Sequence, residues 1–145
     1  MSMRRIGSRQ YNQVQIQTAN RGKLIVMLYQ GAIRNLNLAV SHIDQGDMEG
    51  KGNALIRAQD IVLELLFALD QQMLDDGNEL ALNLQRLYLY AYRRLIAANL
   101  QVDRKIVEEI NTLLTRLLAA WESVVSGEAG ADQQADQPAG VTLTG

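Results

Sequence analysis

The chain contains a single proline, Pro138, close to its C-terminal end. Proline breaks or kinks a helix because it lacks a backbone N–H and its ring collides with the preceding turn. The long stretch before Pro138 can therefore run in long helices. From Leu24 onward its apolar residues recur at steps of three and four, which is the helical period. The sequence therefore predicts an all-α fold.

Turn signals divide this helical pattern into four segments. Asn20, Asp47 and Asp103 are N-cap candidates, and Gly46 is expected to end the first segment in the left-handed conformation. Four helices joined by short turns predict an antiparallel up-down-up-down four-helix bundle. The segments expected to be helical are about 20–45, 47–73, 79–99 and 103–126.

Two segments of different composition flank the bundle, which we place at residues 18–126. Residues 1–17 lack the helical period and are expected to form an N-terminal arm with the apolar side chains Ile6, Tyr11, Val14 and Ile16. Residues 127–145 consist mostly of Gly, Ala, Asp, Gln and Thr. Such a composition buries too little surface to order itself, so a disordered acidic tail is predicted.

Charge and residue content exclude several classes of protein. The net charge of -2 and the pI near 5.4 argue against a nucleic-acid binder, although residues 1–43 carry six basic side chains and no acidic one. No apolar run approaches ~18 residues, so we expect no membrane insertion. The chain has no cysteine, one histidine (His42) and no phosphate-binding loop. We therefore expect no catalytic, cofactor-binding or metal site, and no enzyme.

The helices carry more apolar residues than one core stripe needs, since a bundle helix buries about three of seven positions. One interpretation is a broad core. The other is a second apolar surface that binds a partner, typically an amphipathic helix laid in an interhelical groove. The fourth helix adds Val107, Leu114, Leu118 and Val125 to this surplus. The candidate groove residues on the first and third helices are Ile25, Leu28, Tyr29, Ile33, Leu82, Leu89, Tyr92 and Ile96.

Three alternating tyrosines, Tyr88, Tyr90 and Tyr92, lie in the third predicted helix. They point in different directions, so only one or two of them can be core residues. The others are expected to lie at the surface, where the tyrosine ring and its polar tip suit the edge of an interface.

Several short motifs occur in a characteristic order. They are Tyr11-Asn12-Gln13-Val14, the run from Leu24 to Arg34, Gln45-Gly46-Asp47, Arg93-Arg94-Leu95 and Ala120-Trp121. In this order and spacing, over about residues 10–123, the chain resembles the flagellin-specific export chaperones of the FliS family. It departs from the family pattern at Asn20-Arg21-Gly22, where the family commonly has Ser-Pro-Glu.

The resemblance implies a cytoplasmic four-helix chaperone. Such a protein binds the disordered C-terminal segment of flagellin, prevents its premature polymerisation and aids its export by the flagellar type III secretion system. The implied partners are that segment, the export apparatus and a flagellin assembly factor, and the free chaperone is expected to be a monomer or weak homodimer. The resemblance also implies that the arm covers part of the flagellin groove. The alternative is a homo-oligomeric structural bundle whose extra apolar face is a self-association surface.

Overall fold

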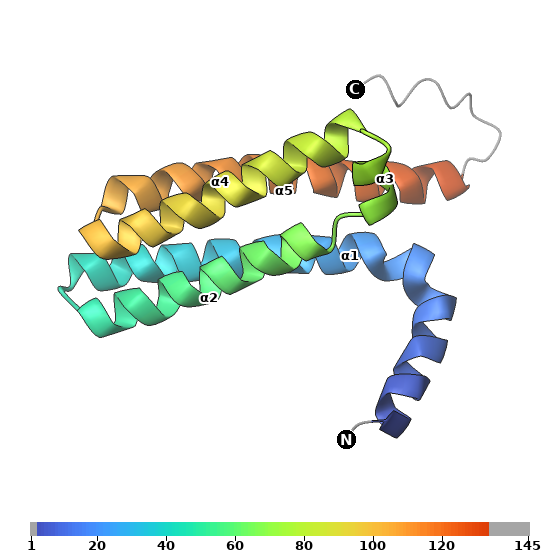
Figure 1. The fold of residues 1–145 in the computed structure, drawn as a ribbon, viewed down its shortest axis with the longest axis horizontal. Helices are drawn as coiled ribbons and strands as arrows, with labels where there is room; N and C mark the ends of the chain where they lie inside the picture. Colours follow the sequence, from blue (N-terminus) through green and yellow to red (C-terminus); the bar gives the residue numbers. More distant parts are fainter. Residues whose placement is uncertain (1–2, 134–145) are drawn as a thin grey trace. The chain divides into compact units, whose positions relative to one another are not determined.

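Helices joined by short turns make up the described chain. The computed structural model describes the backbone of residues 3–133 and the side chains of residues 20–127. These residues contain five helices and no strand, which confirms the all-α prediction (Figure 1). The helices are α1 (Met3–Asp44), α2 (Met48–Phe67), α3 (Gln71–Asp75), α4 (Glu79–Gln101) and α5 (Arg104–Gln133).

Local signals end and start helices where the sequence predicts. The Asp47 side chain accepts a hydrogen bond from the Gly50 amide at 2.9 Å, and that of Asp103 accepts one from the Lys105 amide at 2.9 Å. Both bonds satisfy amides that the first turn of a helix leaves without a partner. Gly46 has a φ of 74° and ends α1 in the left-handed region, as expected.

The start of α1 differs from the prediction. The helix begins at Met3, so Asn20 lies inside it and is no N-cap, and residues 3–17 are not an irregular arm. Gln and Arg favour helices by intrinsic propensity, which requires no apolar stripe. The side chains of Ile6, Tyr11, Val14 and Ile16 lie outside the described residues.

Two other helix ends also differ. The second helix is expected to run to about Met73, but α2 ends at Phe67. A new short helix, α3, follows, and the Asp70 side chain caps it by accepting hydrogen bonds from the amides of Gln72 and Met73. The last helix was expected to end near Ser126, but α5 continues to Gln133. Residues 127–133 are therefore helical, and the remainder of the predicted disordered tail, residues 134–145, lies outside the described residues.

Residues 27–118 form one of two compact units, with a core shared by four long helices. Inside it, α2 packs against α4. The buried hydroxyls of Tyr29 on α1 and Tyr88 on α4 hydrogen-bond at 2.5 Å. Lys51, only 7% exposed, donates from Nζ to the Asn99 carbonyl oxygen at 2.9 Å. The start of α2 therefore lies beside the end of α4, so these two helices run antiparallel.

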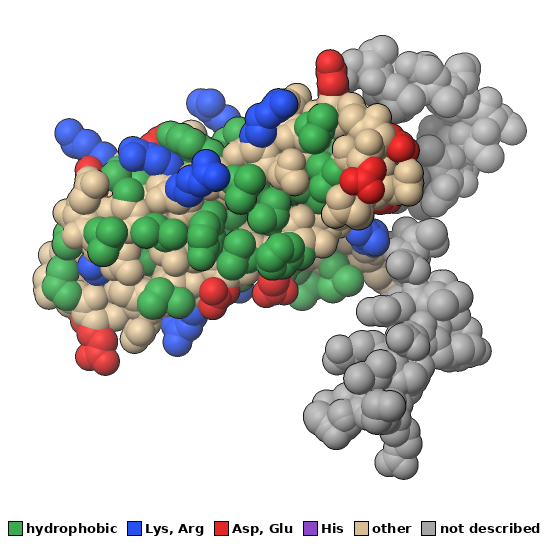
Figure 2. All heavy atoms as spheres, in the orientation of Figure 1, with side chains coloured by type: hydrophobic (Ala, Val, Ile, Leu, Met, Phe, Trp, Pro, Cys, Tyr) green, Lys and Arg blue, Asp and Glu red, His purple; other side chains and the backbone are tan. Residues whose placement is uncertain are grey.

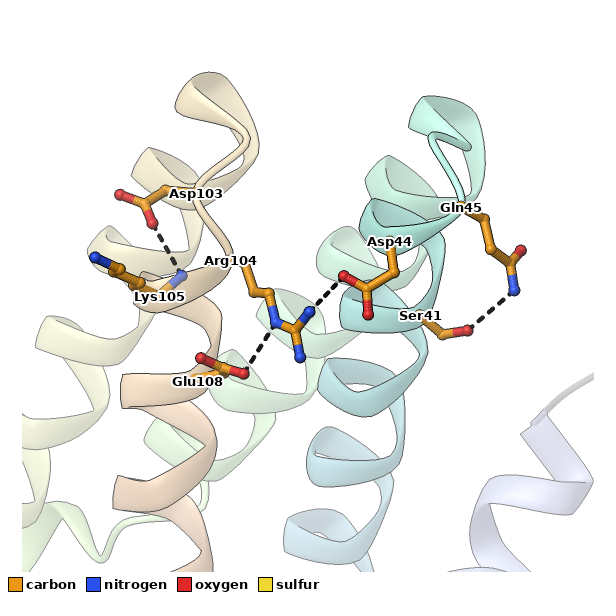
Figure 3. A network of polar contacts seen from close by, with 7 residues as sticks. All are labelled: Ser41, Asp44, Gln45, Asp103, Arg104, Lys105 and Glu108. Carbon is orange, nitrogen blue, oxygen red and sulfur yellow. Dashed lines mark hydrogen bonds and ion pairs between the residues drawn. The ribbon is translucent and has the colours of Figure 1, made fainter.

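A surface ion-pair network connects α1 to α5 in the same unit (Figure 3). The Arg104 guanidinium donates to Glu108 at 3.0 Å and to Asp44 at 2.5 Å. The hydrogen bond to Glu108 and the charge of Asp44 raise the pKa of Arg104 above its ordinary value. Arg104 thus stays charged and holds the end of α1 beside the start of α5.

The second compact unit comprises residues 1–26 and 119–145. Its described part includes a buried Ile25 and a close approach of α1 to α5. A Cβ atom placed on Gly22 would lie 2.8 Å from Val125 Cγ2, so only glycine fits at this point without a shift.

Two glycines near the start of α2 offer a test of this packing. A Cβ on Gly50 would lie 2.6 Å from Asp47 Oδ2 and would clash with His42, whose Nδ1 is 3.0 Å from the same carboxylate oxygen. A Cβ on Gly52 would meet its nearest neighbour, Asn99 Oδ1, at 3.9 Å.

We therefore predict opposite effects for two identical substitutions. Gly52→Ala should raise the free energy of unfolding by about 0.5–1 kcal/mol, because alanine favours the helix. Gly50→Ala should lower it, because the added methyl disturbs the Asp47 cap. Urea unfolding followed by circular dichroism measures both. Equal stabilisation by the two substitutions would contradict the described contact.

Candidate functional site

Hydrophobic side chains form a band across the outside of α2 and α4 (Figure 2). Within each helix they recur at steps of three, four or seven residues, which keeps them on one side of the helix. The two helices pack against each other, so the two stripes adjoin. We call the set the α2–α4 face; its members are Ile56, Leu63 and Phe67 on α2, and Leu82, Leu89, Tyr92, Ile96 and Leu100 on α4.

The α2–α4 face contains some of the most exposed apolar side chains of the described residues. Leu100 is 80% exposed and Phe67 is 77% exposed, while Ile56 reaches 49%. The remaining members are half-buried, apart from Ile96 at 38%. Single exposed apolar residues are ordinary, but a contiguous apolar band marks a surface that another molecule covers.

The structure divides the predicted groove residues between different locations. The four on the third predicted helix, Leu82, Leu89, Tyr92 and Ile96, all belong to the α2–α4 face. Leu28 is half-buried on α1.

Two residues of the predicted groove are core residues instead. Tyr29 is fully buried and Ile25 is 9% exposed, so the prediction that they line a surface groove is wrong. Leu24 and Met27, which begin the helical pattern, are 57% and 62% exposed, whereas Leu36 and Ala39 farther along α1 are fully buried. The prediction of which side of α1 is buried therefore fails only around residues 24–29. The broad-core interpretation also holds for Val107 and Leu114, which are fully buried.

Ile33, the last predicted groove residue, lines a different hollow. This hollow has a volume of about 400 Å³. It lies on α1 and receives one side chain from α5. Its lining residues are Gln30, Ile33, Arg34, Asn37, Leu38 and Leu118.

The three tyrosines of α4 have the predicted range of environments. Tyr88 is buried, Tyr92 is half-buried and Tyr90 is 43% exposed. The Tyr90 hydroxyl donates a hydrogen bond to the carboxylate of Glu109 on α5, and this hydrogen bond raises the pKa of Tyr90 above its ordinary value. Arg94 lies 3.3 Å from the same carboxylate. Tyr88 is therefore a core residue, Tyr92 belongs to the α2–α4 face, and Tyr90 connects α4 to α5 by a hydrogen bond.

Sequence reasoning missed Ile56, Leu63, Phe67 and Leu100. A signal for three of them existed, because Ile56, Leu63 and Phe67 are separated by seven and four residues, and such steps also occur in the predicted stripe of the third helix. Phe67 is also the only phenylalanine of the chain. The expectation that the second helix continues to Met73 concealed this pattern, since it places Phe67 inside a helix and not at its exposed end.

The α2–α4 face offers apolar contact and no reactive chemistry. Among the described residues, no three His, Cys, Asp or Glu side chains gather as ligands for a metal ion. Across the same residues, no helix combines the length and apolar character needed to cross a membrane.

Comparison with known proteins identifies the family. The family model described as flagellar protein FliS matches residues 4–128. The chain is 39% identical over 123 residues to the flagellar secretion chaperone FliS of Salmonella typhimurium, covering 81% of this chain and 89% of that protein. It is 36% identical over 118 residues to the flagellar secretion chaperone FliS of Bacillus subtilis, covering 81% and 85%. A match over most of the chain, in a protein with an exposed apolar surface, establishes that this chain belongs to the FliS family of flagellar secretion chaperones, which are not enzymes.

Proposed function

We propose that this protein is a cytoplasmic chaperone that binds the disordered C-terminal segment of flagellin on the α2–α4 face. Bound there, the segment is withheld from premature polymerisation until the flagellar secretion system takes it. Family membership supports the function, and the exposed apolar band of α2 and α4 supports the location. The antiparallel up-down order of the four long helices, the free protein as a monomer or weak dimer, and contacts with the export apparatus and a flagellin assembly factor are parts of the same proposal.

The chemistry of the face fits a segment that folds on binding. An amphipathic helix laid on two adjacent helices buries its apolar side against theirs. Ordering a disordered segment costs about 2–5 kcal/mol of the gross interaction energy, which keeps such binding reversible. Reversibility is what a chaperone needs if its client must leave intact for secretion.

One pair of variants tests the location. Phe67→Ser removes a 77% exposed ring from the α2–α4 face, whereas Leu38→Ser removes a 44% exposed apolar side chain from the hollow on α1. We expect Phe67→Ser to weaken binding of the C-terminal segment of the same organism's flagellin about tenfold, because an aromatic contact at an interface is often worth ~1.4 kcal/mol or more. Leu38→Ser should bind as wild type. Isothermal titration calorimetry measures both.

Melting curves provide the control, since both side chains are exposed and neither variant should unfold. The reverse ranking, with Leu38→Ser weakening the complex and Phe67→Ser leaving it unchanged, would move the client to the hollow on α1. Sedimentation of the free protein at rising concentration tests the alternative that the face serves self-association.

We further propose that residues 1–17 compete with flagellin for its binding surface. These residues carry Arg4, Arg5 and Arg9, while residues 44–126 carry eight basic and thirteen acidic side chains. Opposite charge attracts the segment to its own chain, and a tethered ligand has an effective concentration in the ~mM range. Its apolar side chains, Ile6, Tyr11, Val14 and Ile16, would supply the contacts.

Deletion of residues 1–16 should therefore tighten flagellin binding, because the apparent affinity rises when the covered fraction of the surface falls. The same titration measures this change. An unchanged affinity in the truncated protein would remove this role from the segment, and a weaker affinity would show that the segment holds the client instead.

A further inference from the structure

The corner formed by the end of α2, α3 and the start of α4 combines exposed apolar side chains with a concentration of negative charge. Phe67, Met73 and Leu80 are 77%, 39% and 64% exposed. Between Arg57 and Arg86 the chain carries no basic side chain. The acidic residues of this interval, all exposed, are Asp60, Glu64, Asp70, Asp75, Asp76 and Glu79.

No cation neutralises these carboxylates within the described residues. Asp70 accepts hydrogen bonds from two amides of α3, and Asp75 and Asp76 accept from the side chains of Gln71 and Gln72. These donors are neutral, so the negative charge of the corner persists. Figure 2 shows several acidic side chains gathered at the α3 end and basic side chains distributed along α4 beyond it.

Two arginines lie on the half of the α2–α4 face that is remote from α3, and the exposed carboxylate of Glu49 lies beyond them in the first turn of α2. The hydrogen bond between Lys51 and Asn99 sets the register of the two antiparallel helices. Arg57 and Arg93 are each six residues from that bond, so both lie about 9 Å along their helices at ~1.5 Å per residue. Both are exposed, and among the described residues neither forms an ion pair. The charge of the face is therefore polarised along its length, from the carboxylates of the α3 corner to Arg57 and Arg93 on the remote half.

We propose that this polarisation fixes the direction in which a helical segment binds to the α2–α4 face. The occupant is an amphipathic helix of about 18 residues, matching the rise from Leu82 to Leu100. Its basic end lies over the α3 corner, and its acidic end lies over Arg57 and Arg93. This inference rests on the proposed function, because it assumes that the face binds a helix.

Charge is suited to this task because apolar contact is not directional. A stripe of apolar side chains meets the face about equally well in either direction, so it supplies affinity. Complementary charges instead select one orientation over another. The helix dipole adds to the effect, since the positive N-terminal end of a helix is favoured near carboxylates.

Two synthetic peptides of identical composition test the proposal. Both carry the same apolar stripe; the first has Lys in its first two turns and Glu in its last two, and the second has the reverse. Each has a donor fluorophore at its N-terminus. The chain contains no cysteine, so Gln72→Cys on α3 or Gln101→Cys at the end of α4 places a single acceptor at either end of the face.

We expect the first peptide to transfer energy more efficiently to position 72 and the second to position 101. Neutralising the corner with Asp70→Asn, Asp75→Asn, Asp76→Asn and Glu79→Gln should bring the two transfer efficiencies close to equality, and asparagine at position 70 still caps α3. High salt should do the same, because exposed charges are screened. The control Phe67→Ser should weaken both peptides alike and leave their directions unchanged.

Two outcomes separate this inference from the proposed function. If both peptides bind in the same direction, or each binds in both directions at low salt, the directional role of the charges is wrong while the face remains a binding site. If neither peptide binds, the assignment of the α2–α4 face as a helix-binding surface is wrong, and the inference about direction is overturned with it.

Discussion

The close packing of alanines in the core determines how the rest of the apolar surface is distributed. Seven alanines of α1, α2 and α4 are at most 4% exposed. Small side chains let helices approach closely, and a protein interior at crystal-like density has no space for more large groups. The larger apolar residues beyond this core therefore remain outside. The buried alanines are Ala32, Ala39, Ala54, Ala58, Ala81, Ala91 and Ala98.

This division explains why a small helical protein has both a well-packed interior and a broad apolar exterior. The core requires only part of the apolar content, and a large share of the remainder lies on α2 and α4. The most exposed members of the α2–α4 face, Phe67 and Leu100, contribute little to the core, so they can be replaced with little effect on the stable interior.

The sequence predicted those features that depend on local chemistry. Asp47 and Asp103 mark helix starts because a short carboxylate side chain bonds the nearby amides. The predicted start of the first helix is wrong, because the residues that follow Met3 form a helix without an apolar stripe that would indicate it. The sequence also misled about which side of α1 is buried around residues 24–29. Ile25 with Tyr29, and Leu24 with Met27, are both spaced as residues on one side of a helix. Only the neighbouring helices decide which set is buried. The α4 part of the site was predictable because its opposite stripe, with Leu84, Ala91 and Leu95, is clearly the core.

The buried pair of hydroxyls, Tyr29 and Tyr88, has a consequence for mechanical behaviour. Alanine and leucine surfaces can slide along each other, because a shift by one helical turn, ~5.4 Å, replaces one apolar contact with another. A hydrogen bond between two particular side chains is met at only one axial position. The tyrosine pair thus opposes sliding of α1 along α4. The axial alignment of α1 and α4 is therefore specified by polar chemistry, although the core around the pair is apolar.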